Sequence, residues 1–356
     1  MELLDVDDEW ENFMSGVGED APCYKETELA VSSISDQSCP KATDIYISTK
    51  TNISYLNQPV DLKDVFWKIP ILKYSTPAVG IVKKQMKFNS TEKSELDQIQ
   101  TRLQSEQCVE ENILTSIDNP SGRIKFKDIR KVSIGICKKD VVSYRSKKKS
   151  AFYNCFVMIL RIKENDIFKE FHVKVFNTGK LEIPGVKTDS TFNEIISMVV
   201  QVLSPYMPEN LHVLKEKTQT VLINSNFNCG FYINRELLFD ILRNNYGIEA
   251  IYDPCSYPGI QCKFYYKQNQ EIQNGVKDGG EYVDVSFMIF RTGSVLIVGK
   301  CEEEVLYVIY EFLKDILRRE FSVIGVHVIH DAIVKQKCVK TRKKTILIEQ
   351  HEGRVV

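Results

Sequence analysis

The sequence predicts an α+β protein in which one unit of antiparallel strands and helices occurs twice. From residue 45 onward, β-branched runs alternate with amphipathic segments. The motif Phe176–Gly179 (Phe-Asn-Thr-Gly) recurs 114 residues later as Phe290–Gly293 (Phe-Arg-Thr-Gly). The same offset pairs apolar residues with apolar residues from Val175 through Leu203, and a register held over that length indicates an internal repeat.

Each copy is expected to begin with a strand and a short helix. In the first copy these are Tyr46–Tyr55 and Asp61–Lys68. In the second they are Thr220–Tyr232 and Arg235–Arg243, the helix starting behind an Asn234 N-cap. Two such units can join edge to edge, which leaves helices on one face of the sheet and the other face open. The open face is where function is expected.

Each copy then passes through a Thr-Gly turn into a further strand and a long helix. Gly179 and Gly293 are predicted to adopt the positive φ that a tight hairpin needs. In the first copy, Thr191 and Glu194 fit a capping box at the start of the helix. That helix carries an apolar stripe of Phe192, Ile195, Val199, Val202 and Leu203.

Composition and charge divide the chain into four regions. They are a disordered acidic arm (1–44), a first repeat (45–208) with a basic insertion at about 75–150, a second repeat (209–325) and a basic C-terminal extension (326–356). The insertion is expected to contain a helix near Glu92–Glu106.

The net charge of −1 conceals two opposite parts. Residues 1–40 hold eleven acids and one base, so the rest of the chain carries +9, and residues 123–149 alone hold eleven bases against two acids. A near-neutral total therefore does not exclude a polyanionic partner. The apolar residues Trp10 and Phe13 favour an arm that docks a protein partner or masks the basic surface in cis, while a solubilising tail explains its composition equally well.

The sequence lacks the motifs of common enzyme sites. It has no phosphate-binding glycine loop, no H-E-x-x-H and no nucleophile elbow, so neither catalysis nor a cofactor is expected. His327, His330 and Asp331 lie in or just after an alternating strand, where a structural role is favoured over a metal site. The ten cysteines lack metal-ligand spacing and are expected to be free thiols, and no apolar run reaches the length of a membrane span.

The two copies resemble the repeats of the TATA-box-binding protein (TBP) family, in particular the divergent versions carried by large nucleocytoplasmic DNA viruses. The resemblance covers residues 45–325 apart from the insertion, and its motifs are Val175–Lys180, Pro184–Lys187, Tyr257–Gly259, Ile289–Gly293 and Val298–Lys300. It implies a saddle of two pseudo-symmetric repeats, a curved antiparallel sheet with helices on the convex face. It also implies a viral transcription initiation factor that binds and bends promoter DNA through the minor groove and recruits transcription initiation factors and RNA polymerase.

The resemblance further implies which residues of the concave sheet contact DNA. Phe176 and Phe290 are implied as wedges that unstack base steps, with Tyr257 as the partner wedge in the second copy and either Phe152 or Phe156 in the first. The other implied contacts are Asn52 and Asn224 near the central base pairs, Leu296 and Val298 as an apolar floor, and Arg145, Lys147, Lys148 and Lys149 in the basic window.

Two residues depart from the family pattern. Glu182 and Pro184 stand where Val and Thr are usual, and a carboxylate on the DNA face would repel phosphates and bury an unpaired charge. Two alternatives therefore stay open: a scaffold that keeps the saddle but binds proteins, and non-specific nucleic-acid binding through residues 123–149. No membrane partner is expected, and the expected locations are the host nucleus, a cytoplasmic viral factory or the virion.

Overall fold

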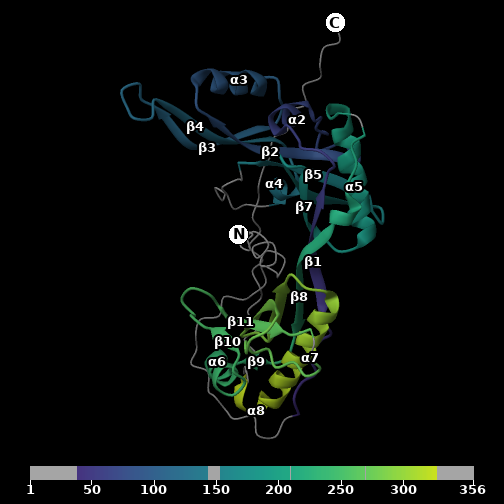
Figure 1. Cartoon of the computed structure of the whole chain (residues 1–356), viewed down its shortest axis with the longest axis vertical. Coiled ribbons are helices and arrows are strands. Elements are labelled where there is room, and N and C mark those ends of the chain that lie inside the picture. The colour runs from purple at the N-terminus through teal and green to yellow at the C-terminus, as the bar shows by residue number, and fades with distance from the viewer. Residues whose placement is uncertain (1–37, 143–152, 209, 269, 327–356) are drawn as a thin grey trace, which may run out of the picture.

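A computed structural model describes residues 38–142, 153–208, 210–268 and 270–326 (Figure 1). Most of the acidic arm and nearly all of the C-terminal extension, including His327, His330 and Asp331, lie outside these ranges. Within them, twelve strands form one antiparallel sheet in the order β10-β11-β12-β13-β8-β1-β7-β6-β5-β2-β4-β3. The predicted fold class, α+β with a large antiparallel sheet, is confirmed.

The elements of the first half are β1 (Tyr46–Tyr55), α2 (Leu62–Lys68), β2 (Gly80–Ser90), α3 (Lys93–Leu103), β3 (Val109–Asp118), β4 (Phe126–Gly135), α4 (Lys138–Val142), β5 (Cys155–Glu164), β6 (Ile167–Phe176), β7 (Lys180–Val186) and α5 (Asp189–Leu203). Those of the second half are β8 (Gln219–Asn228), β9 (Tyr232–Ile233), α6 (Arg235–Asn244), β10 (Glu249–Ile251), β11 (Gly259–Tyr266), β12 (Val283–Phe290), β13 (Ser294–Gly299), α7 (Glu303–Arg319), α8 (Phe321–Ile324) and β14 (Gly325–Val326). β9 and β14 form a separate ribbon.

The hairpins of the two halves lie at the offset that the sequence predicts. β7 and α5 begin 114 residues before β13 and α7. The turn glycines Gly179 and Gly293 have φ of 82° and 79°. A Cβ at Gly293 would lie 2.3 Å from the carbonyl oxygen of Phe231, so this turn has room only for glycine.

β1 and β8 pair in the middle of the sheet and join the two halves (Figure 1). Lys50 of β1 lies opposite Val186 of β7 and Ile223 of β8, which belong to the hydrophobic cores of the first and second half. Because opposite residues share one face of a sheet, both cores lie on the same face. α5 and α7 cover this face, and the Lys50 ammonium bonds Glu303 in the first turn of α7 at 2.5 Å. The opposite side is called the open face below.

α5 begins earlier than the predicted capping box. Thr188 is the N-cap, and its hydroxyl accepts a hydrogen bond from the Thr191 backbone N–H at 3.2 Å. The capping box of Thr191 and Glu194 was therefore wrong, because Thr188 offers the same hydroxyl one turn upstream and places Asp189 in the first turn, where its charge favours the helix dipole. The predicted apolar stripe is buried, apart from Val202, which is partly buried.

The first half is larger because the insertion adds strands to the sheet. β2 pairs with β5 where β10 pairs with β11 in the second half, and β4 and β3 extend the sheet beyond β2. α3, the helix predicted near Glu92–Glu106, buries Ile99 and Leu103 in the same core as α5. The insertion is thus part of the first hydrophobic core and not a separate surface loop.

The remaining expectations concern cysteines, metal sites and membrane-spanning helices. In the described part of the chain the cysteines are free thiols, and no cluster of His, Cys, Asp or Glu has the composition of a metal site. No helix in those ranges is both long and apolar enough to cross a bilayer.

Candidate nucleic-acid interface

The open face of the second half has an apolar floor beside a row of amides. Leu296 and Val298 of β13 lie on this face, because the residue between them, Ile297, lies in the core. Leu296 lies opposite Asn226 of β8, and Val298 lies opposite Asn224. Apolar groups next to amide donors suit the minor groove, whose A·T pairs present only the acceptors adenine N3 and thymine O2.

An aromatic pair stands beside this floor, at the end of β12. Phe290 and Tyr257 are half-buried, and their ring centroids are 6.0 Å apart. Gly259 lies opposite Phe290, and a Cβ there would come within 3.0 Å of both rings, so glycine leaves the space in which they pack. The Tyr257 hydroxyl lies 3.6 Å from the Met288 sulfur, and burial raises the pKa of Tyr257. The structure therefore holds both rings in place.

The loop that carries Tyr257 is fixed by hydrogen bonds at both ends. The Asp253 carbonyl accepts from the Tyr257 backbone N–H at 2.9 Å, and the Asp253 carboxylate accepts from the Cys255 backbone N–H at 3.0 Å. Arg235 of α6 donates to the Pro258 carbonyl. A loop fixed in this way loses little conformational entropy when it binds a ligand.

Thr49 and Asn224 occupy the centre of the open face. They lie opposite each other in β1 and β8, and the Asn224 amide donates to the Thr49 hydroxyl at 3.0 Å. Asn224 thus lies on the surface where the resemblance implied it. Thr49 was missed, because its position follows from the strand register and not from a motif.

Asn52 does not lie on the open face, and its implied role at the central base pairs is wrong. It is 7% exposed, lies opposite the core residue Ile183, and accepts a hydrogen bond from the Thr220 hydroxyl at 2.8 Å. The register shifts between Lys50 and Asn52 toward β7, and between Thr51 and Asn52 toward β8. These shifts leave the alternation of β1 intact: Asn52 follows the core-facing Lys50 by two residues and lies on the same face of the sheet.

The open face of the first half carries an ion pair where the second half is apolar. Glu182 of β7 lies opposite Lys174 of β6, with carboxylate and ammonium 2.7 Å apart. Glu182 is 5% exposed, but the unpaired buried charge expected from the sequence is not found, because Lys174 neutralises it. The offset of 114 residues places Met288 and Leu296 at these two positions in the second half.

Phe176 ends β6 on the open face, whereas Phe156 does not reach it. Phe176 is half-buried, and the Lys180 ammonium lies 5.2 Å from its ring centroid. Phe156 is fully buried in the core, with its ring 6.2 Å from that of Phe66. Phe156 as a wedge is therefore wrong, because the strand directs it toward the helices. Phe152, the other candidate, lies outside the described residues.

Tyr153 is the aromatic residue that sequence reasoning missed. It precedes Cys155 by two residues, as Tyr257 precedes Gly259, and Cys155 and Gly259 each lie opposite the last Phe of the next strand. Tyr153 is 56% exposed, and the Lys87 ammonium lies 3.6 Å from its ring centroid. Strand register identifies Tyr153 as the counterpart of Tyr257, and register is not visible in one sequence.

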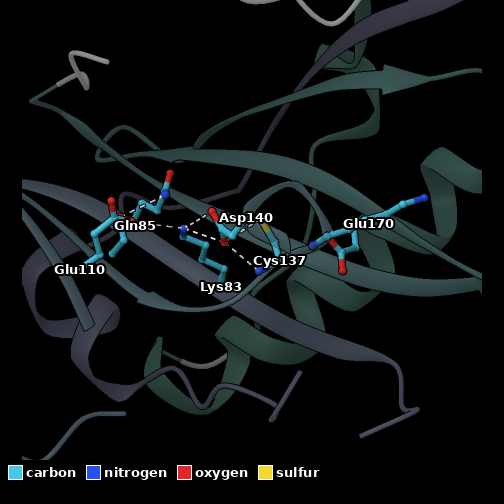
Figure 2. A network of polar contacts seen from close by, with 8 residues as sticks. Lys83, Gln85, Glu110, Cys137, Asp140 and Glu170 are labelled. Atoms are coloured by element: carbon cyan, nitrogen blue, oxygen red, sulfur yellow. Dashed lines mark hydrogen bonds and ion pairs between the residues drawn. The ribbon is translucent and has the colours of Figure 1, made fainter. Parts of the chain in front are cut away.

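Residues 136–142, which follow β4, pack on the open face of the first half, and Figure 2 shows the polar contacts that hold them. Asp140 of α4 binds the ammonium of Lys83 in β2 through both carboxylate oxygens at 2.9 Å. Lys83 lies opposite Ile159 of β5, which alternates with the core residues Met158 and Leu160. Lys83, Ile159 and Asp140 are therefore on the side away from α5.

Cys137 and Glu170 attach the rest of this segment. Cys137 packs in a small apolar cluster on β2 and β5, and its backbone N–H donates to Asp140 at 2.9 Å. Glu170 of β6 accepts from the Lys138 backbone N–H at 2.7 Å and bonds Arg161 of β5 at 3.3 Å. Burial raises the pKa of the Cys137 thiol to about 11. Burial also opposes ionisation of Asp140, but the hydrogen bonds it accepts outweigh this and lower its pKa.

Only part of the predicted basic window can be located. Arg145, Lys147, Lys148 and Lys149 lie outside the described residues. Arg130 of β4 is 5% exposed and bonds Asp128 and Glu111 at 2.6 Å each. At least this base is neutralised within the fold, so the net charge of the window is larger than the charge available to bind a polyanion.

The name of one curated relative agrees with the resemblance. No protein-family model matches the chain. A curated relative named TATA-box-binding protein-like, from Acanthamoeba polyphaga mimivirus, is 22% identical over 233 residues. The match covers 60% of this chain and 62% of the relative, so the chain spans less than two thirds of the relative's length. The solved structure of the Methanococcus jannaschii TBP aligns with 78% of this chain and 99% of its own length, at 13% identity and a TM-score of 0.38.

Proposed function

We propose that this protein is a TBP-like transcription initiation factor that binds and bends promoter DNA through the minor groove and recruits transcription machinery. The observation that carries the proposal is the open face of the second half, where the Tyr257–Phe290 pair stands beside the Leu296–Val298 floor. Aromatic wedges and apolar surface are the means by which proteins widen and kink the minor groove. The proposed function involves no catalysis.

The amides on β8 favour A·T base pairs over G·C. Asn224 and Asn226 lie on the open face and can donate to adenine N3 and thymine O2. A G·C pair adds the guanine N2 amino group, a donor that would meet the side chain of Leu296 or Val298, neither of which can accept a hydrogen bond. An unsatisfied polar group at a dry contact lowers affinity.

Bending follows from the position of the aromatic pair at one end of the floor. A ring inserted between two base pairs costs about a few kcal/mol of stacking and turns the duplex toward the major groove. The kinked duplex then contacts more of the sheet, which offsets that cost.

The partners proposed for the rest of the molecule are proteins. With DNA on the open face, α5 and α7 remain available to transcription initiation factors and RNA polymerase. The acidic arm docks one of these partners or masks the basic surface in cis, since its charge of −10 opposes the +9 of the remaining chain. The proposed sites of action are the host nucleus, a cytoplasmic viral factory or the virion.

Duplex binding tests the proposal. We expect an A/T-rich duplex of about 30 base pairs to bind at least about tenfold more tightly than a G/C-rich one at the same salt concentration. Val298→Glu should abolish that difference by placing a carboxylate on the floor, whereas Leu237→Glu, at a position of α6 that is 42% exposed, should not. Equal affinity for both duplexes, or an unchanged preference in Val298→Glu, would contradict minor-groove recognition.

A protein-binding scaffold is the second candidate function. The Lys174–Glu182 ion pair and the covering of β2 and β5 by the segment around Asp140 favour it, because both remove surface that DNA could contact. The scaffold predicts no measurable affinity of the wild-type protein for either duplex.

A further inference from the structure

We infer that the two halves of the open face contact DNA unequally: the second half alone inserts an aromatic wedge, and the first half contacts the phosphate backbone through lysines without opening a base step. This inference rests on the proposed function and specifies how the duplex lies on the sheet.

The aromatic rings of the two halves have different neighbours. In the second half, Phe290 and Tyr257 contact each other, 6.0 Å between centroids. In the first half, Phe176 contacts the Lys180 ammonium at 5.2 Å, and Tyr153 contacts the Lys87 ammonium at 3.6 Å. A ring must leave such a cation before it enters the base stack, and the cation is attracted instead to the phosphates outside the stack.

The residue opposite each phenylalanine explains this difference. Gly259 leaves room for Tyr257 to lie against Phe290. At the corresponding place Cys155 adds a side chain, 3% exposed, opposite Phe176. The pair of rings that forms a broad wedge in the second half therefore has no equivalent space in the first.

The strands that pair with β12 and β6, which are β11 and β5, also differ in how far their side chains are exposed on the open face. On β11, Gln261 and Lys263 are exposed next to the aromatic pair. The corresponding residues of β5 are Val157, which is partly exposed, and Ile159, 2% exposed; one position further, both strands bury the side chain, Arg161 at 6% and Tyr265 at 5% exposed. Arg161 donates to the Tyr74 carbonyl at 3.0 Å, and the segment around Cys137 covers Ile159. A duplex can therefore lie along β11, whereas on β5 it meets the segment around Cys137.

The first-half residues at the positions of the apolar floor also favour contact with the phosphate backbone over insertion of a ring between base pairs. Lys174 and Glu182 hold a charged pair where the second half has methyl and thioether groups. Apolar contact with an opened minor groove is lost there, while Lys180 at the edge of β7 can neutralise a phosphate. Lysine–phosphate contacts position a duplex without recognising its sequence.

The experiment compares the same substitution in both halves. The probe is an A/T-rich duplex of about 30 base pairs with fluorescent donor and acceptor at its ends, so that energy transfer reports the bend and titration reports affinity. Phe290→Leu should lose the bend and about tenfold in affinity or more, whereas Phe176→Leu should change both by less than about twofold. Lys180→Gln should reduce the slope of log affinity against log salt by about 0.9 and leave the bend unchanged.

Folding and function are separated by further measurements. Circular dichroism and thermal midpoints identify any variant that fails to fold, and Phe290→Tyr, which keeps a ring, should restore the bend in the folded protein. Equal loss of bending in Phe176→Leu and Phe290→Leu would overturn the inference and leave the proposed function intact. Wild-type binding without bending would overturn the wedge in both halves, and no duplex binding at all would overturn the proposed function together with this inference.

Discussion

Glu182→Gln should tighten DNA binding, although it removes a buried and paired charge. Glu182 neutralises Lys174 at 2.7 Å, and Lys174 is the more exposed partner, with 25% of its side chain accessible against 6% for Glu182. Glutamine keeps the shape of glutamate but not its charge, so the Lys174 ammonium can neutralise a phosphate. One additional cation should steepen the slope of log affinity against log salt by about 0.9, which corresponds to about an eightfold gain at roughly 0.1 M salt.

The assay for this prediction is fluorescence anisotropy of a labelled A/T-rich duplex at four or more salt concentrations. Glu164→Gln is the matched control, because Glu164 pairs with Lys169 at 2.6 Å on the helix-covered side, where Lys169 lies opposite the core residue Ile162. That variant should leave the slope unchanged. An unchanged slope in Glu182→Gln, with a normal thermal midpoint, would refute the placement of the Lys174–Glu182 pair against DNA.

Three further predictions concern stability and the acidic arm. Asp140→Asn should lower the free energy of unfolding by about 2 kcal/mol at neutral pH in urea titrations, because it leaves the ammonium of Lys83, 4% exposed, with the more distant carboxylate of Glu110 at 3.9 Å. The pKa of Asp140 is lowered by folding, so its stabilising charge is lost as pH falls through that value; the difference from wild type should shrink below about pH 4, and a constant difference contradicts this account. Gly293→Ala should cost more than about 2 kcal/mol, and Gly185→Ala only about 1 kcal/mol, because both have positive φ but only Gly293 has a carbonyl in the place of the new Cβ. Removing residues 1–37, which hold all eleven acids counted in the arm, should raise duplex affinity and steepen its salt dependence if the arm masks the basic surface, and unchanged affinity at matched salt argues against masking.

The order of elements was predictable because it depends on local patterns. The strand Tyr46–Tyr55 has the predicted bounds, and Asn234 caps α6 as expected. Which face a strand residue occupies depends instead on register. Asn52 matched the resemblance by residue type, yet it follows the core-facing Lys50 by two residues and shares its face, and Thr49 takes the open-face position beside Asn224.

The prediction that Phe156 is a wedge failed for a related reason. Along β5, Phe156, Met158 and Leu160 alternate with Cys155 and Ile159, so both faces of the strand are largely apolar. A strand of this kind gives no period-2 signal that distinguishes its faces. Phe156 was therefore as acceptable a candidate as any, and only pairing with β6 assigns it to the core.

Contacts over long sequence separations were also beyond local reasoning. Lys83 and Asp140 are 57 positions apart and meet only because β4 returns the chain to β2. The basic window appeared in the sequence as one surface, but its Arg130 is held by Asp128 and Glu111 inside the extended sheet. Charge counting along the chain cannot distinguish a base that faces solvent from one that faces an acid.

The insertion accounts for why two halves with the same order of elements differ on the open face. The outer strand β10 of the second half spans three residues, while its counterpart β2 spans eleven and pairs on both sides. With strands on both edges, β2 lies inside the sheet and its open-face residue Lys83 is 3% exposed; a buried ammonium needs a carboxylate nearby. Asp140 supplies it, and the segment that brings Asp140 also covers Ile159 on β5. The larger core of the first half and the smaller surface it offers to DNA are therefore consequences of the same inserted strands.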